Sequence, residues 1–200
     1  MNQNEQLLLE KAKKGDVAAF EELTEVYQKK IFNLAYRMTG NYDDASDMAQ
    51  EALIRIFKSI GNFKEQSSFS TWIYRITTNV CLDELRRKKN KKVFSLDEEI
   101  HADDGEIQRQ IMSDDPQPDE VVEKEELKRI VNNAINNLQD DQKLVITLRD
   151  IQGLSYEEIS NVLECPVGTV KSRINRARQA LKNILMSKRE LLNEHYVKQI

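Results

Sequence analysis

The sequence predicts an all-α protein made of two small helical domains joined by a flexible acidic linker. Apolar residues recur at spacings of three and four through most of the 200 residues, as they do on the buried face of an amphipathic helix. No stretch shows the alternation of apolar and polar residues that is typical of a half-buried strand. The chain has three prolines and six glycines, and 32% of its residues are charged. This composition favours a soluble, mostly helical chain.

The first domain is predicted over residues 1–92 and begins with two helices. A short amphipathic helix covers residues 5–14 and is ended by Gly15. Asp16 can cap the next helix, and Gly40 can end it. The apolar face of this second helix holds Phe20, Leu23, Tyr27, Ile31, Leu34 and Met38.

A turn at residues 41–44 leads into a third helix with a continuous apolar stripe. The stripe consists of Ala45, Met48, Ala49, Ala52, Leu53, Ile56, Phe57 and Ile60. The opposite face carries Asp47, Gln50, Glu51, Ile54 and Lys58. Ile54 is apolar among polar residues, so it marks either a docking surface or a singly exposed isoleucine.

A polar loop over residues 61–70 precedes a fourth helix, predicted at residues 71–88. Trp72, Ile73, Ile76 and Val80 form its inward stripe, whereas Tyr74, Arg75, Thr78 and Asn79 lie off it. The run 86–92 holds six basic residues in seven positions. Aromatic residues beside cations suit single-stranded nucleic acid, because bases stack on rings while cations hold the backbone. The alternative is that the rings are core residues, and this is the favoured interpretation for Trp72.

Residues 93–119 are predicted to be a linker that is disordered in isolation. They have little periodicity and contain both Pro116 and Pro118, and residues 93–120 hold ten acidic residues and one arginine. The net charge of −4 argues against a nucleic-acid partner only when the chain is taken as a whole. Because basic and acidic residues are segregated, each segment has to be judged by its own charge.

The second domain is predicted over residues 120–188, followed by a C-terminal tail at 189–200. One helix buries Leu127, Ile130, Val131, Ala134, Ile135 and Leu138. Asp140 and Asp141 open another, which buries Leu144, Val145, Leu148 and Ile151.

The end of this domain predicts a helix-turn-helix. Ser155 and Glu158 have the spacing of a capping box, so a helix should start at Tyr156. Residues 164–166 cannot continue it, and Pro166 suits the first position of a new helix. That helix buries Val167, Val170, Ile174, Ala177, Leu181 and Leu185. Residues 165–189 contain seven basic residues and no acidic one, which suits a helix in the DNA major groove. The alternative is a helical hairpin with a solvated basic face.

The sequence predicts neither a metal site, nor a cofactor, nor catalysis by this chain. Cys81 and Cys165 are lone cysteines, and His101 and His195 are isolated. No apolar run approaches the roughly 20 residues that span a membrane, and the N-terminus lacks a signal-peptide pattern. We therefore expect a cytoplasmic protein.

Three blocks in this order resemble a known family. They are DMAQEALIRIFKSI, FSTWIYRITTNVCLDELRRKK and, after the acidic linker, LRDIQGLSYEEISNVLECPVGTVKSRINRAR. Together they resemble the extracytoplasmic-function group of bacterial RNA polymerase sigma factors, over about residues 15–185. The resemblance implies a protein that binds core RNA polymerase, directs it to promoters and promotes DNA melting, in a stress or envelope response.

By this resemblance the first domain is a sigma-2 domain, which docks on core polymerase and opens the minus-ten element. The family's docking helix matches residues 44–60. Its outer residues Asp47, Gln50, Glu51 and Ile54 would meet the clamp helices of the largest polymerase subunit, which favours docking for Ile54.

The family's minus-ten reading elements match the loop and the fourth helix. The implied DNA-binding residues are Asn62, Phe63, Ser68, Phe69, Tyr74, Arg75 and Asn79. A base flipped from the non-template strand would sit in a pocket made by the 62–70 loop. Flipping costs a few kcal/mol, so the pocket has to be built for it.

The second domain is implied to be a sigma-4 domain that reads the minus-thirty-five element. Its implied DNA-binding residues are Gly168, Thr169, Lys171, Ser172, Arg173, Asn175, Arg176 and Arg178. The family also implies contact with the flap of the second-largest polymerase subunit and control by an anti-sigma factor. It implies no small-molecule ligand and no insertion into the membrane. The acidic linker would thread the polymerase channel later used by RNA, although a solvated spacer has the same composition.

Two rival functions remain, and a nuclease is not supported. An autonomous helix-turn-helix regulator would bind duplex DNA by itself, and it needs a dimerisation element or ligand pocket that the sequence does not suggest. A helical interaction protein without a nucleic-acid role leaves the two basic segments unexplained. A nuclease needs carboxylates facing a groove, whereas the acidic residues here cluster in the proline-containing linker.

Overall fold

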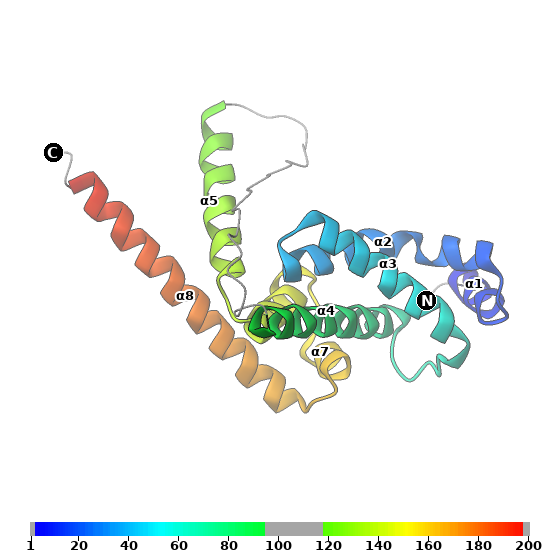
Figure 1. Ribbon diagram of the computed structural model, residues 1–200. Helices are drawn as coiled ribbons and strands as arrows, with labels where there is room; N and C mark the ends of the chain where they lie inside the picture. Colours follow the sequence, from blue (N-terminus) through cyan, green and yellow to red (C-terminus); the bar gives the residue numbers. More distant parts are fainter. Residues whose placement is uncertain (1–2, 95–117, 198–200) are drawn as a thin grey trace.

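The computed structural model describes residues 3–94 and 118–197. All regular elements of these two segments are helical (Figure 1), so the predicted all-α class is confirmed for them. The first segment contains α1 (Gln3–Lys13), α2 (Val17–Thr39), α3 (Tyr42–Ser59), the short 3-10 helix η1 (Ile60–Asn62) and α4 (Phe69–Phe94). The second contains α5 (Pro118–Asn136), α6 (Asp140–Ile146), the π-helical turn η3 (Thr147–Ile151), α7 (Tyr156–Leu163) and α8 (Val167–Val197).

Helix ends in the first segment follow local side-chain chemistry. The Asp16 carboxylate accepts a hydrogen bond from the Ala19 amide at 3.0 Å and caps α2, and Gly40 ends α2 with a φ of 72°. Both predicted caps are therefore confirmed. Helix α3 begins at Tyr42, earlier than predicted, because the Asn41 side chain accepts a hydrogen bond from the Asp44 amide at 3.0 Å.

Helix α4 lies in the middle of the molecule, with α2 and α3 on one side and α7 on the other (Figure 1). It is longer than predicted at both ends. Tyr74 and Thr78, predicted to lie off the buried stripe, are only 4% and 1% exposed. That expectation was wrong because α4 is covered on two faces, by α2 and α3 on one side and by α7 on the other. A single buried stripe accounts for only one of these faces.

The helix-turn-helix forms largely as predicted. Ser155 and Glu158 make both hydrogen bonds of the capping box at the start of α7. Glu164 takes a left-handed conformation with a φ of 50° and ends this helix. Pro166 was predicted to be the first residue of the next helix, but it immediately precedes α8, and its carbonyl accepts from the Val170 amide at 3.1 Å.

Two predicted core residues of the second segment are exposed. Leu127 is 62% exposed, whereas Ala134 and Ile135, two turns further along α5, are buried. Ile151 is 39% exposed. It ends the π-helical turn, which has more residues per turn than an α-helix and therefore rotates the following side chains away from the predicted stripe.

Helices extend into both ends of the predicted linker and into the predicted tail. Helix α4 continues to Phe94 and α5 begins at Pro118, so both ends of the 93–119 linker are helical. Residues 95–117 of that predicted linker lie outside the described residues. Helix α8 continues to Val197, so most of the predicted 189–200 tail belongs to this helix.

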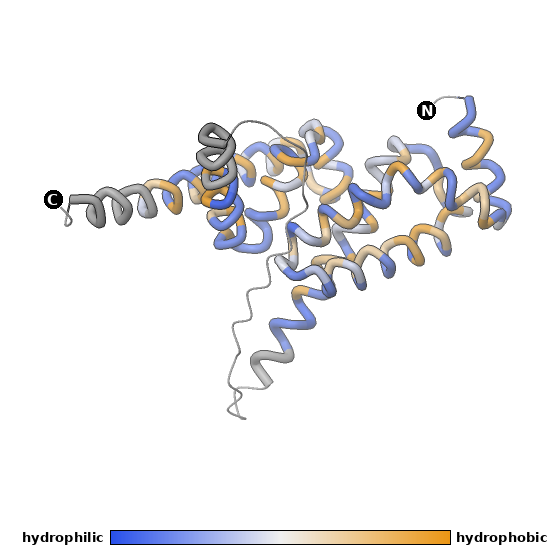
Figure 2. Tube along the Cα trace, turned by 90° about the horizontal axis from the view of Figure 1, so that it is seen from above, coloured by the Kyte–Doolittle hydropathy of each residue, from blue (hydrophilic) through white to orange (hydrophobic). Residues whose placement is uncertain are grey.

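Buried apolar residues of the two segments form one continuous cluster. Hydrophobic and hydrophilic residues alternate along the helices rather than separating into long blocks (Figure 2). The cluster includes residues of α2 and α4 as well as α6 and α7, and α2 contacts α6 while α4 contacts α7. Among the described helices, none is both long and apolar enough to cross a membrane.

The two cysteines are expected to differ in reactivity. Cys81 is fully buried, and burial raises the pKa of its thiol to about 12, whereas Cys165 is partly exposed. Thiols react as thiolates, so N-ethylmaleimide at neutral pH should modify Cys165 in the folded protein and Cys81 only after unfolding. Intact-mass spectrometry over time measures this, and rapid addition of two adducts to the folded protein would contradict it.

Candidate functional site

The outer face of α3 combines polar side chains with one exposed aliphatic residue. Asp47 and Gln50 are exposed, and Ile54 is 46% exposed. Ala45, Ala52 and Ile56 are fully buried on the other side of the helix. The sequence pattern therefore predicted correctly which side of α3 faces solvent.

Glu51, the fourth residue predicted on this face, is held by its neighbours. Its carboxylate accepts from Arg55 Nε at 2.6 Å, and Arg55 Nη1 donates to the Asp83 carboxylate of α4 at 3.3 Å. The hydrogen bond to Glu51 is the main cause of a raised Arg55 pKa. This exposed bridge links α3 to α4 at the surface.

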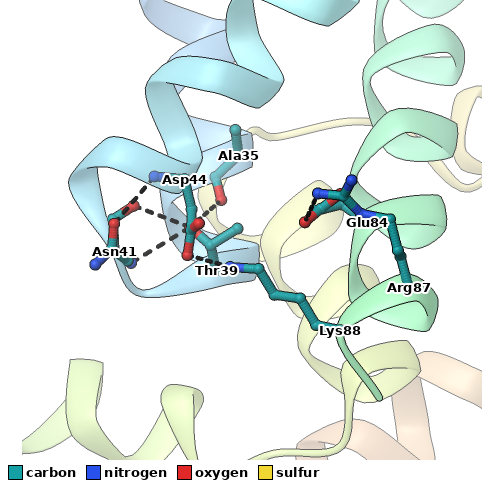
Figure 3. A network of polar contacts seen from close by, with 7 residues as sticks. All are labelled: Ala35, Thr39, Asn41, Asp44, Glu84, Arg87 and Lys88. Atoms are coloured by element: carbon teal, nitrogen blue, oxygen red, sulfur yellow. Dashed lines mark hydrogen bonds and ion pairs between the residues drawn. The ribbon is translucent and has the colours of Figure 1, made fainter. Parts of the chain in front are cut away.

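A second polar network joins the start of α3 to the end of α4 (Figure 3). Lys88 forms an ion pair with Asp44 in the first turn of α3. The Thr39 hydroxyl donates to the Asn41 carbonyl at 3.1 Å, beside the cap that starts α3. Part of the basic run on α4 is therefore paired with acidic residues of its own domain.

The loop before α4 is built on an aromatic cluster. The ring centroids of Phe63 and Trp72 are 5.0 Å apart, and those of Phe63 and Phe69 are 5.5 Å apart. Phe69 also meets Tyr27 of α2 at 5.7 Å. Phe63, Phe69 and Trp72 are 6%, 2% and 7% exposed. The predicted base-contacting rings of Phe63 and Phe69 thus pack into the core, where they shape the loop from beneath.

The loop is also fixed by polar contacts. The Lys13 ammonium of α1 donates to the Glu65 carboxylate at 2.6 Å, and Glu65 has a φ of 58°. The Ser68 hydroxyl accepts from the Thr71 amide at 3.1 Å and so caps α4. Neither Lys13 nor Glu65 was found from sequence, because a contact across 52 residues leaves no local pattern.

A pocket of about 680 Å³ lies between this loop and the helix-turn-helix. On one side it is lined by Asn62, Phe63, Lys64, Gln66, Ser67, Trp72 and Arg75, and on the other by Ser160, Asn161, Glu164, Cys165 and Pro166. Residues 62–64, 66 and 67 of the loop lie on one wall of this pocket, and the second domain forms the opposite wall.

The three candidate residues of α4 differ in accessibility. Asn79 is exposed, and Arg75 is partly exposed. Tyr74 is buried, and its hydroxyl donates to the Gln152 side chain at 2.9 Å. Burial raises the pKa of Tyr74 to about 12, so this phenol is neutral and a donor at physiological pH.

The outer face of α8 presents most of the predicted minus-thirty-five residues to solvent. Gly168, Lys171, Ser172, Asn175, Arg176 and Arg178 are exposed, and Thr169 and Arg173 are partly exposed. Val170, Ile174 and Ala177 are fully buried behind this face. No neighbouring atom lies within 4 Å of where a Cβ on Gly168 would be, so this face is open at its start.

Two basic residues of this face, Arg178 and Lys171, contact side chains of neighbouring elements. Arg178 Nη2 donates to Asp150 Oδ1 at 2.5 Å, and this pairing raises the Arg178 pKa. The Lys171 ammonium lies 5.9 Å from the ring centre of Tyr156. Asp150 lies on the π-helical turn, and sequence reasoning did not identify it as a partner of α8.

Two family models match the chain, one in each domain. The model described as sigma-70 region 2 matches residues 23–91, and that described as sigma-70 region 4 matches residues 128–181. The first match contains α3, the 62–70 loop and most of α4, and the second contains the helix-turn-helix. Both matches lie within the two domains predicted from sequence.

Several curated proteins and solved structures are similar to most of the chain. The ECF RNA polymerase sigma factor SigW of Bacillus subtilis is 42% identical over 88% of this chain and 94% of its own length. The ECF RNA polymerase sigma-E factor of Escherichia coli K12 is 38% identical over 90% and 93%. The sigma factor RpoE of Bartonella quintana, solved with the anti-sigma factor NepR, has a TM-score of 0.63 and 25% identity over 84% and 96%. The chain therefore belongs to the extracytoplasmic-function group of RNA polymerase sigma factors, which bind core RNA polymerase and direct it to promoters.

Proposed function

We propose that this sigma factor docks the outer face of α3 on core RNA polymerase and reads two promoter elements with its two domains, in a stress or envelope response. The observation that carries the proposal is the exposed basic face on α8, paired with a polar loop at residues 62–70 whose exposed side chains include Asn62 and Ser68. The first suits duplex DNA in the major groove, and the second suits a single extruded base.

In the first domain, docking and melting use different faces. Asp47, Gln50, Glu51 and Ile54 are proposed to contact the clamp helices of the largest polymerase subunit. The 62–70 loop, with Asn62 at its start and Ser68 at its end, would receive a base of the non-template strand. Tyr74, Arg75 and Asn79 of α4 would hold the neighbouring nucleotides, while Phe63 and Phe69 support the loop from the core.

In the second domain, α8 would enter the major groove at the minus-thirty-five element. Arg176 is exposed and carries a planar guanidinium that can bind guanine O6 and N7. Ser172 and Asn175 share its face and would read neighbouring bases. Lys171 and Arg178 flank that face and would bind phosphates, and Gly168, Thr169 and Arg173 would complete the contact.

Further partners are proposed from the family. The second domain would also contact the flap of the second-largest polymerase subunit. An anti-sigma factor is proposed as a regulator, since the similar RpoE was solved with one. The acidic segment within 93–119 is proposed to occupy the polymerase channel later taken by RNA, because its negative charge resembles that of an RNA backbone.

Transcription with purified core polymerase tests the proposal. Fragmented genomic DNA of the source organism is transcribed with and without this protein, and RNA 5′ ends are sequenced. The proposal predicts new start sites that share one motif near minus thirty-five and one near minus ten. Start sites that do not depend on the protein, or that share no motif, would refute it.

Loss of the Asn79 side chain should impair melting more than binding. Asn79→Ala is expected to reduce open-complex formation and to alter preference at one or two minus-ten bases, because an exposed amide that bonds an unpaired base is lost. Permanganate reactivity of minus-ten thymines measures this. On pre-melted bubble DNA the Asn79→Ala variant should form the complex as well as the unaltered protein does, because the bases are already unstacked. If thymine reactivity on duplex DNA is the same for Asn79→Ala and the unaltered protein, Asn79 does not bind a base.

A further inference from the structure

Helix α1 lies outside both family matches, because the sigma-70 region 2 match begins at residue 23. It lies at the end of the first domain where the 62–70 loop begins (Figure 1), and it packs on α2 and on η1. Leu9 and Ala12 are fully buried, so the core holds this helix in place. A fixed helix end therefore lies beside the loop that is proposed to receive a base.

The end of α1 contacts alternate residues at the start of the loop. The Lys13 ammonium donates to the Glu65 carboxylate at 2.6 Å and lies 5.7 Å from the ring centre of Phe63. The Lys13 carbonyl oxygen would lie 3.6 Å from a Cβ placed on Gly61. Asn62, between two of these contacted residues, is exposed. The contacts with α1 thus leave a proposed base-binding side chain open to a ligand.

Glu65 has a backbone conformation that needs support from its surroundings. Its φ of 58° is left-handed, a region that residues with a side chain rarely adopt. Such conformations persist where neighbouring contacts hold them. The buried Phe63 ring fixes the start of the loop and Ser68 caps α4 at its end, while the Lys13–Glu65 hydrogen bond ties the middle to another helix. Loss of the Lys13 side chain should therefore loosen residues 64–67 in particular.

Lys13 is suited to act on this loop rather than on overall stability. Its side chain is 18% exposed and that of Glu65 is 48% exposed. Ion pairs with such an exposed partner contribute little to the free energy of unfolding. The hydrogen bond to Glu65 raises the pKa of Lys13, so the ammonium is charged at physiological pH. Removing it should change the local order of the loop and leave the fold intact.

We propose that Lys13 is a positioning residue of the minus-ten site, which holds the 62–70 loop through Glu65 and Phe63 in the conformation that receives the unpaired base. The inference rests on the proposed function of this loop. Extruding a base costs stacking energy, and a loop that also had to be ordered on binding would add a second cost. Helix α1 orders the loop before the DNA arrives and so removes that second cost.

Substitution of Lys13 in the full-length protein tests this proposal. Lys13→Ala removes both the hydrogen bond to Glu65 and the cation beside Phe63. Lys14→Ala is the matched control, because Lys14 is the next residue, is exposed and takes no part in the loop contacts above. Lys13→Arg keeps a cationic donor at the same position. Circular dichroism and the affinity for core polymerase are expected to be the same for all three variants.

The order of the loop is measured first, without polymerase. Rapid-quench hydrogen exchange with mass spectrometry follows a peptide that covers the 62–70 loop. This peptide should exchange faster in Lys13→Ala than in Lys14→Ala, while peptides from α3 exchange equally. Unchanged exchange of the loop peptide would show that Lys13 does not hold the loop, and would overturn the proposal.

Promoter melting is then measured with each holoenzyme. Permanganate reactivity of minus-ten thymines reports opening, and selection from a library randomised at both promoter elements gives the base preferences. If loss of the Lys13 side chain leaves the competent loop conformation populated about one tenth of the time, base capture weakens about tenfold. Preference should relax at the minus-ten base that the loop binds, while minus-thirty-five preference stays as in Lys14→Ala.

The expected result is faster loop exchange, lower thymine reactivity and relaxed minus-ten preference in Lys13→Ala, with Lys13→Arg close to the unaltered protein. Faster exchange with unchanged melting and preference would show a purely structural contact and overturn the positioning role. Equal losses in Lys13→Ala and Lys14→Ala would overturn it too, because they would reflect a general loss of positive charge. Failure of the proposed function is distinguishable, because the unaltered protein would then give no new start sites with core polymerase.

Discussion

Ile54→Asp should abolish most binding to core RNA polymerase while leaving the protein folded. Ile54 is 46% exposed on a face that is otherwise polar and lies outside the buried core cluster, so the substitution removes little core packing. At an interface it would replace an apolar anchor with a charge that has to be desolvated. Truncation of a central anchor commonly costs ~2 kcal/mol or more, and a buried unpaired charge costs further. A loss of at least about thirtyfold in affinity is therefore expected, measured by biolayer interferometry with immobilised core polymerase.

Val26→Asp is the matched control for this experiment. Val26 is 63% exposed on α2, so the same chemical change is made at another solvent-exposed aliphatic residue. Gln50→Ala with Glu51→Ala should give a smaller loss, because Glu51 is already bonded to Arg55. Equal affinity of Ile54→Asp and Val26→Asp for core polymerase would show that the outer face of α3 is not the docking surface.

Arg176→Ala should relax promoter specificity, whereas Lys171→Ala should weaken all promoters alike. Arg176 lies exposed on the outer face of α8, and a bidentate contact to guanine is worth ~1 to 3 kcal/mol of discrimination. Lys171 lies on the flank and is proposed to bind phosphate. Its removal should lower the slope of log affinity against log salt by about one. Selection from a promoter library with each variant holoenzyme at two salt concentrations measures both effects.

Arg176→Ala and Lys171→Ala serve as controls for each other. Each removes one cation from the same helix, so a general electrostatic effect would appear equally in both. If Arg176→Ala lowers affinity uniformly and keeps the preferred sequence of the unaltered protein, Arg176 positions α8 rather than reading a base. Arg178→Ala is less informative, because its guanidinium is already paired with Asp150.

Features fixed by neighbouring residues could be predicted from the sequence. The Ser155–Glu158 capping box, the Asp16 cap and the left-handed Gly40 each depend on groups within four residues along the chain. The buried stripe of α3 follows from the helical period alone, and Ile56 is fully buried as expected.

Features that depend on distant contacts could not be predicted. Burial of Tyr74 depends on the second domain, through Gln152, which lies 78 residues away. Exposure of Ile151 follows from a π-helical turn, which an α-helical period cannot represent. Lys13 and Arg178 were visible as basic residues, but their partners Glu65 and Asp150 follow only from how helices pack.

The candidate sites divide in the same way. Surface positions on single helices, such as Asn175 and Arg176 on α8, are found from the helical period, and both are exposed. The minus-ten site is built from a loop, a helix and an aromatic cluster. For that site the sequence predicted the position of the 62–70 loop. The burial of Phe63 and Phe69 is known only from the structure.

Permanganate footprinting of a promoter found by transcription tests the central claim most directly. Core polymerase, this protein and the two together are incubated with duplex promoter DNA, and the reactivity of minus-ten thymines is measured. We predict reactive thymines only when both are present, because polymerase holds the DNA while the first domain captures an unpaired base. Equal reactivity with core polymerase alone would contradict the claim. Duplex opening by this protein alone would contradict it as well.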